Sequence, residues 1–307
     1  LPSLAFCWLA LSLCCFDWTR FRPWLYQNSA ILLVVSLAQE SHPTEALNIC
    51  RLILVSIYFW AGLLKLNATF QQTVLPWFLK PILDKIPART YKKLPAILGL
   101  NPPGGTRARS LVIQSYVRNL GLMVPIIEAG FALGLLHPIT RPPALLAAIA
   151  MHSLILYCIS PSGHNYPTVR PWNVCMLLTS CVLFFNSSVG PADILVGNHS
   201  AIHFAVLLLF SFLPVLGLWN LLDPVFSHGH MSGRHVYGQI GLSSMLFKQL
   251  PASTQKYCTE VGVGNGPVMV LDVGRWYLGE MGLPAVQQER LLRTIAQHFG
   301  KFDATAK

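Results

Sequence analysis

The sequence has 307 residues, of which 53% are hydrophobic and 11% are charged, with a net charge of +10. Soluble domains average about 25% charged residues, so this composition excludes an ordinary soluble globule. It also excludes a disordered chain, a disulfide-stapled miniprotein and a nucleic-acid-binding domain. We therefore expect an integral membrane protein whose surface contacts membrane lipids.

Seven apolar stretches follow one another, and only Arg51, Lys65 and Glu128 are charged within them. Backbone groups in a bilayer need internal partners, and these runs alternate too weakly for barrel strands, so they predict helices. We expect an all-α fold with about seven transmembrane helices, although several stretches are shorter than the ~20 residues that cross a bilayer. The stretches are Leu1–Phe16, Trp24–Ala38, Cys50–Leu66, Gly121–Leu136, Ala144–Ile159, Val174–Phe185 and Ala201–Leu222.

The ends and connections of these stretches predict the topology. No Met precedes Leu1, so we expect the true N-terminus upstream, with processing as the alternative. When the connections are assigned alternately to two sides, one side collects most Lys and Arg residues, many of them in Thr69–Asn119. The positive-inside rule places that side, and with seven spans also the tail, in the cytoplasm, matrix or stroma. Within this connection, Val74–Lys85 combines apolar bulk, Trp and Lys, which is typical of a segment in the headgroup layer.

The sequence divides into a transmembrane domain over residues 1–222 and a small extramembrane α+β tail over 223–307. Glu260–Val273 predicts a hairpin around Asn265-Gly266, and Pro284–Phe299 predicts an amphipathic helix. His228, His230 and His235 lie close together, but no carboxylate or Cys completes a metal-ligand spacing, so we predict a polar loop and no metal.

Three polar residues within the apolar stretches are candidates for chemistry. Glu128 lies in the middle of a stretch, where an unpaired charge is costly, so it is either a proton or quinone site or an interhelical polar lock. Lys65 is either a base or a side chain that snorkels from a helix C-terminus. His152 alone is more typical of a hydrogen-bonded packing residue.

One motif resembles a known family. The segment Tyr58-Phe-Trp-Ala-Gly-Leu-Leu-Lys-Leu-Asn-Ala-Thr-Phe70 is similar to the Tyr-Phe-x-Ala-Gly-x-x-Lys-Leu-(Asp/Asn) element of vitamin K-dependent gamma-glutamyl carboxylases. It is equally similar to their bacterial relatives in the horizontally transferred transmembrane (HTTM) and DoxX-like groups. Weaker similarities follow in the same order at Phe16–Tyr26, Glu128–Phe131 and Met151–Ser153, so the resemblance covers roughly residues 16–185.

The resemblance implies a membrane enzyme that binds a quinone, like vitamin K, or a lipid. Lys65 takes the position of the family's base, with Glu128 and His152 as its polar neighbours. A flat apolar quinone would lie between helices against Tyr58, Trp60 and Phe131.

Two departures from the family support another hypothesis. Pro23 and Trp24 stand where the carboxylases have a His, and their large substrate-recognition domain has no counterpart in the tail. The chain is then a non-catalytic accessory subunit of a larger membrane complex, respiratory or photosynthetic. Both hypotheses stay open at the level of the sequence. A transporter is a third interpretation, which Glu128 permits but which no repeated pattern of two halves supports.

Overall fold

A computed structural model describes residues 2–16, 22–37, 43–85, 106–197, 200–223, 226–229, 231–233, 238–263, 266–281 and 292–299. The chain forms two compact units, Leu1–Arg234 and His235–Lys307.

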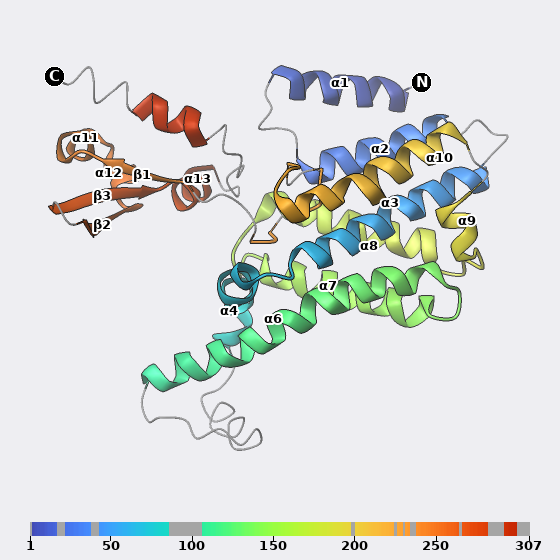
Figure 1. The fold of residues 1–307 in the computed structure, drawn as a ribbon, viewed down its shortest axis with the longest axis horizontal. Helices are drawn as coiled ribbons and strands as arrows, with labels where there is room; N and C mark the ends of the chain where they lie inside the picture. Colours follow the sequence, from blue (N-terminus) through green and yellow to red (C-terminus); the bar gives the residue numbers. More distant parts are fainter. Residues whose placement is uncertain are drawn as a thin grey trace. The chain divides into compact units, whose positions relative to one another are not determined.

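The first unit is helical, and each of the seven apolar stretches lies in a helical segment (Figure 1). In its described ranges, η2 (Phe70–Val74) and η4 (Leu207–Phe212) are π-helical, and η3 (Pro167–Val169) and η5 (Leu213–Trp219) are 3₁₀-helical. The α-helices are α1 (Pro2–Phe16), α2 (Pro23–Leu37), α3 (Pro43–Leu64), α4 (Leu75–Leu83), α6 (Thr106–Leu136), α7 (Arg141–Cys158), α8 (Arg170–Phe184), α9 (Pro191–Leu195) and α10 (Ala201–Val206).

Among the residues that the structure describes, three helical segments are long and apolar enough to cross a membrane: Pro43–Leu64, Arg141–Cys158 and Ala201–Trp219. The expected number of about seven spans is therefore not confirmed. Length is one physical reason, because α1, α2 and α8 have 15 residues each. At 1.5 Å per residue such a helix is about 22 Å long, which is less than the ~30 Å of a hydrocarbon core.

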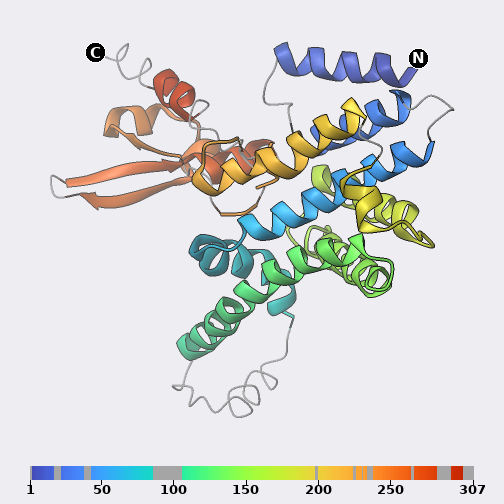
Figure 2. The ribbon, with the colours of Figure 1, turned by 45° about the vertical axis from the view of Figure 1, so that its right-hand side comes forward.

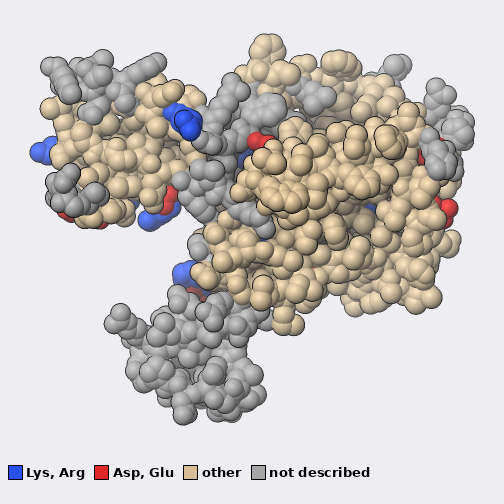
Figure 3. Space-filling model, in the orientation of Figure 1, with Lys and Arg blue, Asp and Glu red and all other residues tan. Residues whose placement is uncertain are grey.

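Helix α3 is the centre of the first unit and lies between α2 and α6 in both ribbon views (Figures 1 and 2). Its middle is apolar on every side, and Leu52, Ile53 and Leu54 are almost inaccessible to solvent. A helix that is apolar all round is one that neighbouring helices or lipid surround completely. In keeping with this, the face of the helical unit drawn in Figure 3 carries very few charged side chains.

Two buried arginines in the first unit bind carbonyl groups. Arg141 donates hydrogen bonds to the carbonyls of Leu135, Leu136, Ser187 and Val189, and Arg51 donates to the carbonyl of Leu183. The last carbonyls of a helix have no partner inside it, and their partial negative charge favours a cation. The guanidinium groups therefore satisfy the C-terminal ends of α6 and α8.

The second unit contains an antiparallel sheet in the order β1-β3-β2, built from β1 (Gln239–Leu242), β2 (Cys258–Val263) and β3 (Gly266–Asp272). The hairpin β2–β3 is paired from Cys258↔Leu271 to Val263↔Gly266, and its two strands run side by side in Figure 2. This confirms the predicted hairpin, while Asn265 lies outside the described residues. The unit also contains α11 (Ser244–Gln249), α12 (Ala252–Gln255), α13 (Val273–Met281) and a helix over 292–299, so the C-terminal half of the predicted Pro284–Phe299 helix is present and Pro284 lies outside the described residues.

Candidate functional site: a buried ion pair and a polar network

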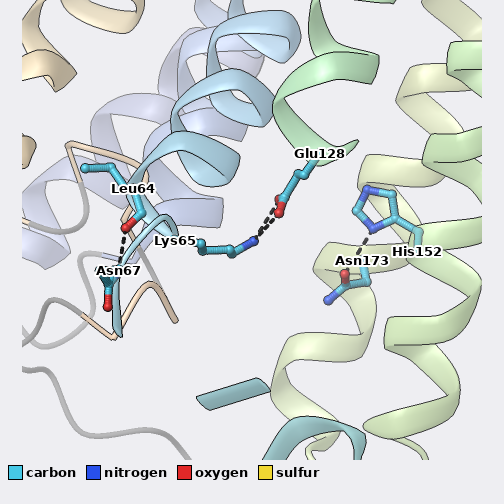
Figure 4. Close-up of polar contacts among 6 residues, drawn as sticks. All are labelled: Leu64, Lys65, Asn67, Glu128, His152 and Asn173. Carbon is cyan, nitrogen blue, oxygen red and sulfur yellow. Dashed lines mark hydrogen bonds and ion pairs between the residues drawn. The ribbon is translucent and has the colours of Figure 1, made fainter. Parts of the chain in front are cut away.

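Lys65, directly after the end of α3, and Glu128, in the C-terminal third of α6, form a largely buried ion pair. Lys65 Nζ lies 2.8 Å from Oε1 and 2.6 Å from Oε2 of Glu128 (Figure 4). The Glu128 side chain is 6% exposed and the Lys65 side chain 16%. The two candidates that lie 63 residues apart in sequence are therefore brought together. Each charge compensates the other, so neither side chain has to reach water.

The residues around Lys65 fix the position of its backbone. Gly62 lies at the crossing of α3 and α6, where a Cβ atom would come within 2.6 Å of the Ala129 nitrogen. Asn67 accepts a hydrogen bond from the Phe70 amide and donates to the carbonyls of Leu64 and Ser232. The motif that resembles the carboxylases thus has a structural role for Gly62 and Asn67, close to the ion pair.

A second buried polar group lies on α3, α7 and α8. The Tyr58 hydroxyl is 2.8 Å from His152 Nε2 and 2.8 Å from Ser180 Oγ. His152 Nδ1 is 3.1 Å from Asn173 Oδ1, whose position beside the ring is visible in Figure 4. All four residues are at most 3% exposed. The prediction from sequence included Tyr58 and His152 but missed Asn173 and Ser180, because a single Asn or Ser in an uncharged stretch gives no signal of its own.

The aromatic candidates divide between two faces of α3. Phe131 packs edge-on against Tyr58, with ring centroids 5.1 Å apart. Trp60 lies two residues after Tyr58, which rotates it about 200° around the helix. Its indole nitrogen donates to the Ser211 carbonyl in η4, 2.9 Å away. Tyr58 and Phe131 therefore lie together, whereas Trp60 belongs to the contact with η4.

The described residues 226–229 and 231–233 lie against the end of α3 and the start of η2. The Gly233 position lies so close to Phe70 that a Cβ atom there would be 2.7 Å from its amide nitrogen. His228, Met231 and Gly233 all have positive φ angles, which few residues other than glycine adopt readily. His228 is 6% exposed and stacks on Phe210, with ring centroids 5.5 Å apart. This segment therefore holds a buried imidazole against Phe210 of η4.

Burial lowers the pKa of His228 from its ordinary value of 6.5 to about 3. Below pH 6.5 the unfolded chain binds a proton that the folded chain excludes, so stability is full above that pH and is lost as the pH falls, by at most about 1.4 kcal/mol per pH unit. We expect His228→Asn to flatten this fall, because Asn tolerates positive φ and does not titrate. Unfolding in detergent from pH 8 to pH 5 measures both slopes, and equal slopes would contradict the assignment.

No metal site accompanies the ion pair in the described part of the chain. There, no three His, Cys, Asp or Glu side chains lie close enough together to bind a metal ion. His230 and His235 lie outside the described residues. In the second unit, an apolar cavity of about 540 Å³ lies between α11 and the helix over 292–299, with Leu246, Trp276 and Phe299 in its wall. The residue pattern gives no sign of this cavity, because its wall comes from separate segments of the chain.

No protein-family model matches this chain, no curated protein matches it, and no solved structure matches its fold.

Proposed function

We propose that the chain is a membrane enzyme that acts on a quinone- or lipid-like substrate, with Lys65 as the base and Glu128 as its proton partner. The observation that carries the proposal is the buried Lys65–Glu128 pair, with both carboxylate oxygens within 2.8 Å of Nζ. A proton that moves from the ammonium to the carboxylate leaves a neutral amine, and a neutral amine can accept a proton from a substrate. The pair therefore provides a base without leaving a charge unpaired.

The surroundings of the pair support an apolar substrate. Lys65 Nζ lies 6.0 Å from the centroid of the Phe70 ring, and Phe70 and Phe131 are both buried. The resemblance of Tyr58–Phe70 to the carboxylase element adds to this, because its lysine position coincides with Lys65. We assign the substrate contact to Tyr58 and Phe131, and we leave Trp60 to the packing of α3 on η4.

Lys65→Arg tests the proposal. Arg keeps the positive charge and can pair with Glu128, but a guanidinium does not lose its proton in proteins. General bases contribute about 10²- to 10⁴-fold, so we expect turnover to fall at least about 100-fold while the unfolding temperature stays close to wild type. The assay is conversion of a reduced short-chain naphthoquinone in lipid nanodiscs.

Lys80→Arg is the matched control, because Lys80 is also paired with a carboxylate, that of Asp84, but is 63% exposed. It should leave turnover unchanged. Full turnover in Lys65→Arg, or no bound or converted quinone with the wild type, would overturn the assignment.

A non-catalytic role in a larger membrane complex is the second candidate function. Helix α1 favours it, because Trp8 is 73% exposed and Phe16 91% exposed, so this helix offers a large apolar surface to lipid or to another subunit. Native mass spectrometry after mild extraction separates the two candidates. A large stable complex supports the accessory role, and a monomer or dimer with a quinone-sized bound mass supports the enzyme.

A further inference from the structure

The buried network of Tyr58, His152, Asn173 and Ser180 has a defined direction. Asn173 Nδ2 donates to the Val169 carbonyl, 2.9 Å away, which leaves Oδ1 facing His152 Nδ1. An amide oxygen only accepts hydrogen bonds, so the imidazole must carry its proton on Nδ1. In a neutral ring Nε2 is then an acceptor, and the Tyr58 hydroxyl donates to it over 2.8 Å.

The opposite tautomer fits less well. With the proton on Nε2, the lone pair of Nδ1 would face the lone pairs of Asn173 Oδ1 at 3.1 Å. With the proton on Nδ1, the only bond given up is the one from Ser180 Oγ to the Met176 carbonyl, because Ser180 then donates to Tyr58. A main-chain carbonyl inside a helix already accepts a bond from the helix ladder, so this loss is small.

The proton count gives the network a further property. It contains five donor–acceptor pairs: Asn173–Val169, His152–Asn173, Tyr58–His152, Tyr58–Ser180 and Ser180–Met176. Each of the four neutral side chains contributes one hydrogen to these five pairs, so one pair always lacks a hydrogen. An imidazolium ring supplies the fifth, with Nε2–H donating to Tyr58 and the Tyr58 hydroxyl turning to Ser180. The network therefore has a hydrogen-bonded place for one more proton, on His152 Nε2.

We propose that Tyr58 and His152 form a second proton-exchange site and that Asn173 is its positioning residue. Asn173 holds His152 with Nε2 as an acceptor. When a proton binds to the Tyr58 oxygen, the original hydroxyl proton of Tyr58 can therefore move to Nε2. The O–H bond of Tyr58 breaks, the N–H bond of His152 forms, and the incoming proton restores the hydroxyl. This inference deepens the proposed function, because Tyr58 lies on α3 and Lys65 follows directly after the last residue of that helix, seven residues further along the chain.

The tautomer of His152 tests this assignment without any turnover. Full-length protein labelled with ¹⁵N-histidine is studied by NMR in lipid nanodiscs, and the His152 signals are assigned by their loss in His152→Gln. We expect the wild type to carry the proton on Nδ1. In Asn173→Leu the acceptor is lost, so the proton should move to Nε2, where it can donate to Tyr58. Asn173→Asp restores an acceptor and should return the proton to Nδ1.

Each outcome supports or overturns the role assigned to His152 and Asn173. A wild-type Nε2–H tautomer overturns the proposal even if no variant folds, and so does an unchanged tautomer in Asn173→Leu. A purely structural Asn173 would alter stability without moving the proton between the two nitrogens. Should Lys65→Arg keep full turnover while the three tautomers follow expectation, the proposed base fails and the assignment of His152 stands.

Discussion

Lys65→Met is expected to destabilise the folded protein by about 3–5 kcal/mol, which is the usual loss when one member of a buried ion pair is removed. The reason is that the Glu128 side chain, only 6% exposed, loses the two contacts of 2.8 and 2.6 Å that compensate its charge. Unfolding of the purified protein in detergent measures the loss. A methionine at this position therefore removes an amine and also leaves a charge unpaired.

The double variant Lys65→Met/Glu128→Leu separates these effects. Replacement of a whole buried pair by apolar side chains is often neutral or stabilising, so the double variant should regain most of the stability. The double-mutant cycle gives the coupling of the two residues directly. If the two single losses simply add, the residues do not interact, and both the ion pair and the proposed base would have to be abandoned.

Gly62→Ala is expected to have the second largest effect, a loss of about 2 kcal/mol or more. The new methyl group would lie 2.6 Å from the Ala129 nitrogen and 2.8 Å from the Pro125 oxygen, and these are backbone atoms that cannot rotate away. Overpacking of this kind costs about 1–3 kcal/mol and occasionally more, and it exceeds the gain of about 1 kcal/mol in helix propensity. The measurement is again the unfolding free energy in detergent.

Gly130→Ala is the matched control on the opposing helix. Nothing lies within 4 Å of the position where its Cβ atom would be. The substitution should be neutral or stabilise by up to about 1 kcal/mol, since only helix propensity changes. Similar effects of the two substitutions would show that α3 and α6 do not approach as closely as the structure has them. Because Gly62 lies one turn before Lys65, Gly62→Ala should also weaken the Lys65–Glu128 coupling.

The sequence predicted the helices of the first unit well because lipid-compatible helices need little more than a long apolar run. The predicted number of membrane spans is not confirmed, because helices such as α8, with 15 residues, are shorter than the ~20 residues that cross a bilayer. Helix α3 shows the converse, because it begins at Pro43, seven residues before the predicted start at Cys50. Polar residues in its first turns obscured that start.

The residues of the site were predicted only in part as neighbours. Glu128 was interpreted as a charge in need of a partner, and it was the family resemblance, not the spacing of the residues, that set Lys65 beside it. Tyr58 and Trp60 were assigned to one quinone slot, although side chains two positions apart on a helix point to nearly opposite sides. Helical periodicity alone would have separated them. Asn173 and Ser180 could only be recognised once α8 was placed beside α7, which is information about packing.

The spacing along α3 has an electrical consequence. Lys65 and Tyr58 are seven residues apart, which is about 10 Å along a helix axis. In a membrane crossed by α3, that distance is about a third of the ~30 Å hydrocarbon core. A charge that crosses the whole core gains or loses about 2.3 kcal/mol per 100 mV. At a membrane potential of 100 mV, a proton that moves between Lys65 and Tyr58 would therefore gain or lose about 0.8 kcal/mol. That energy changes the ratio of its populations at the two sites about fourfold.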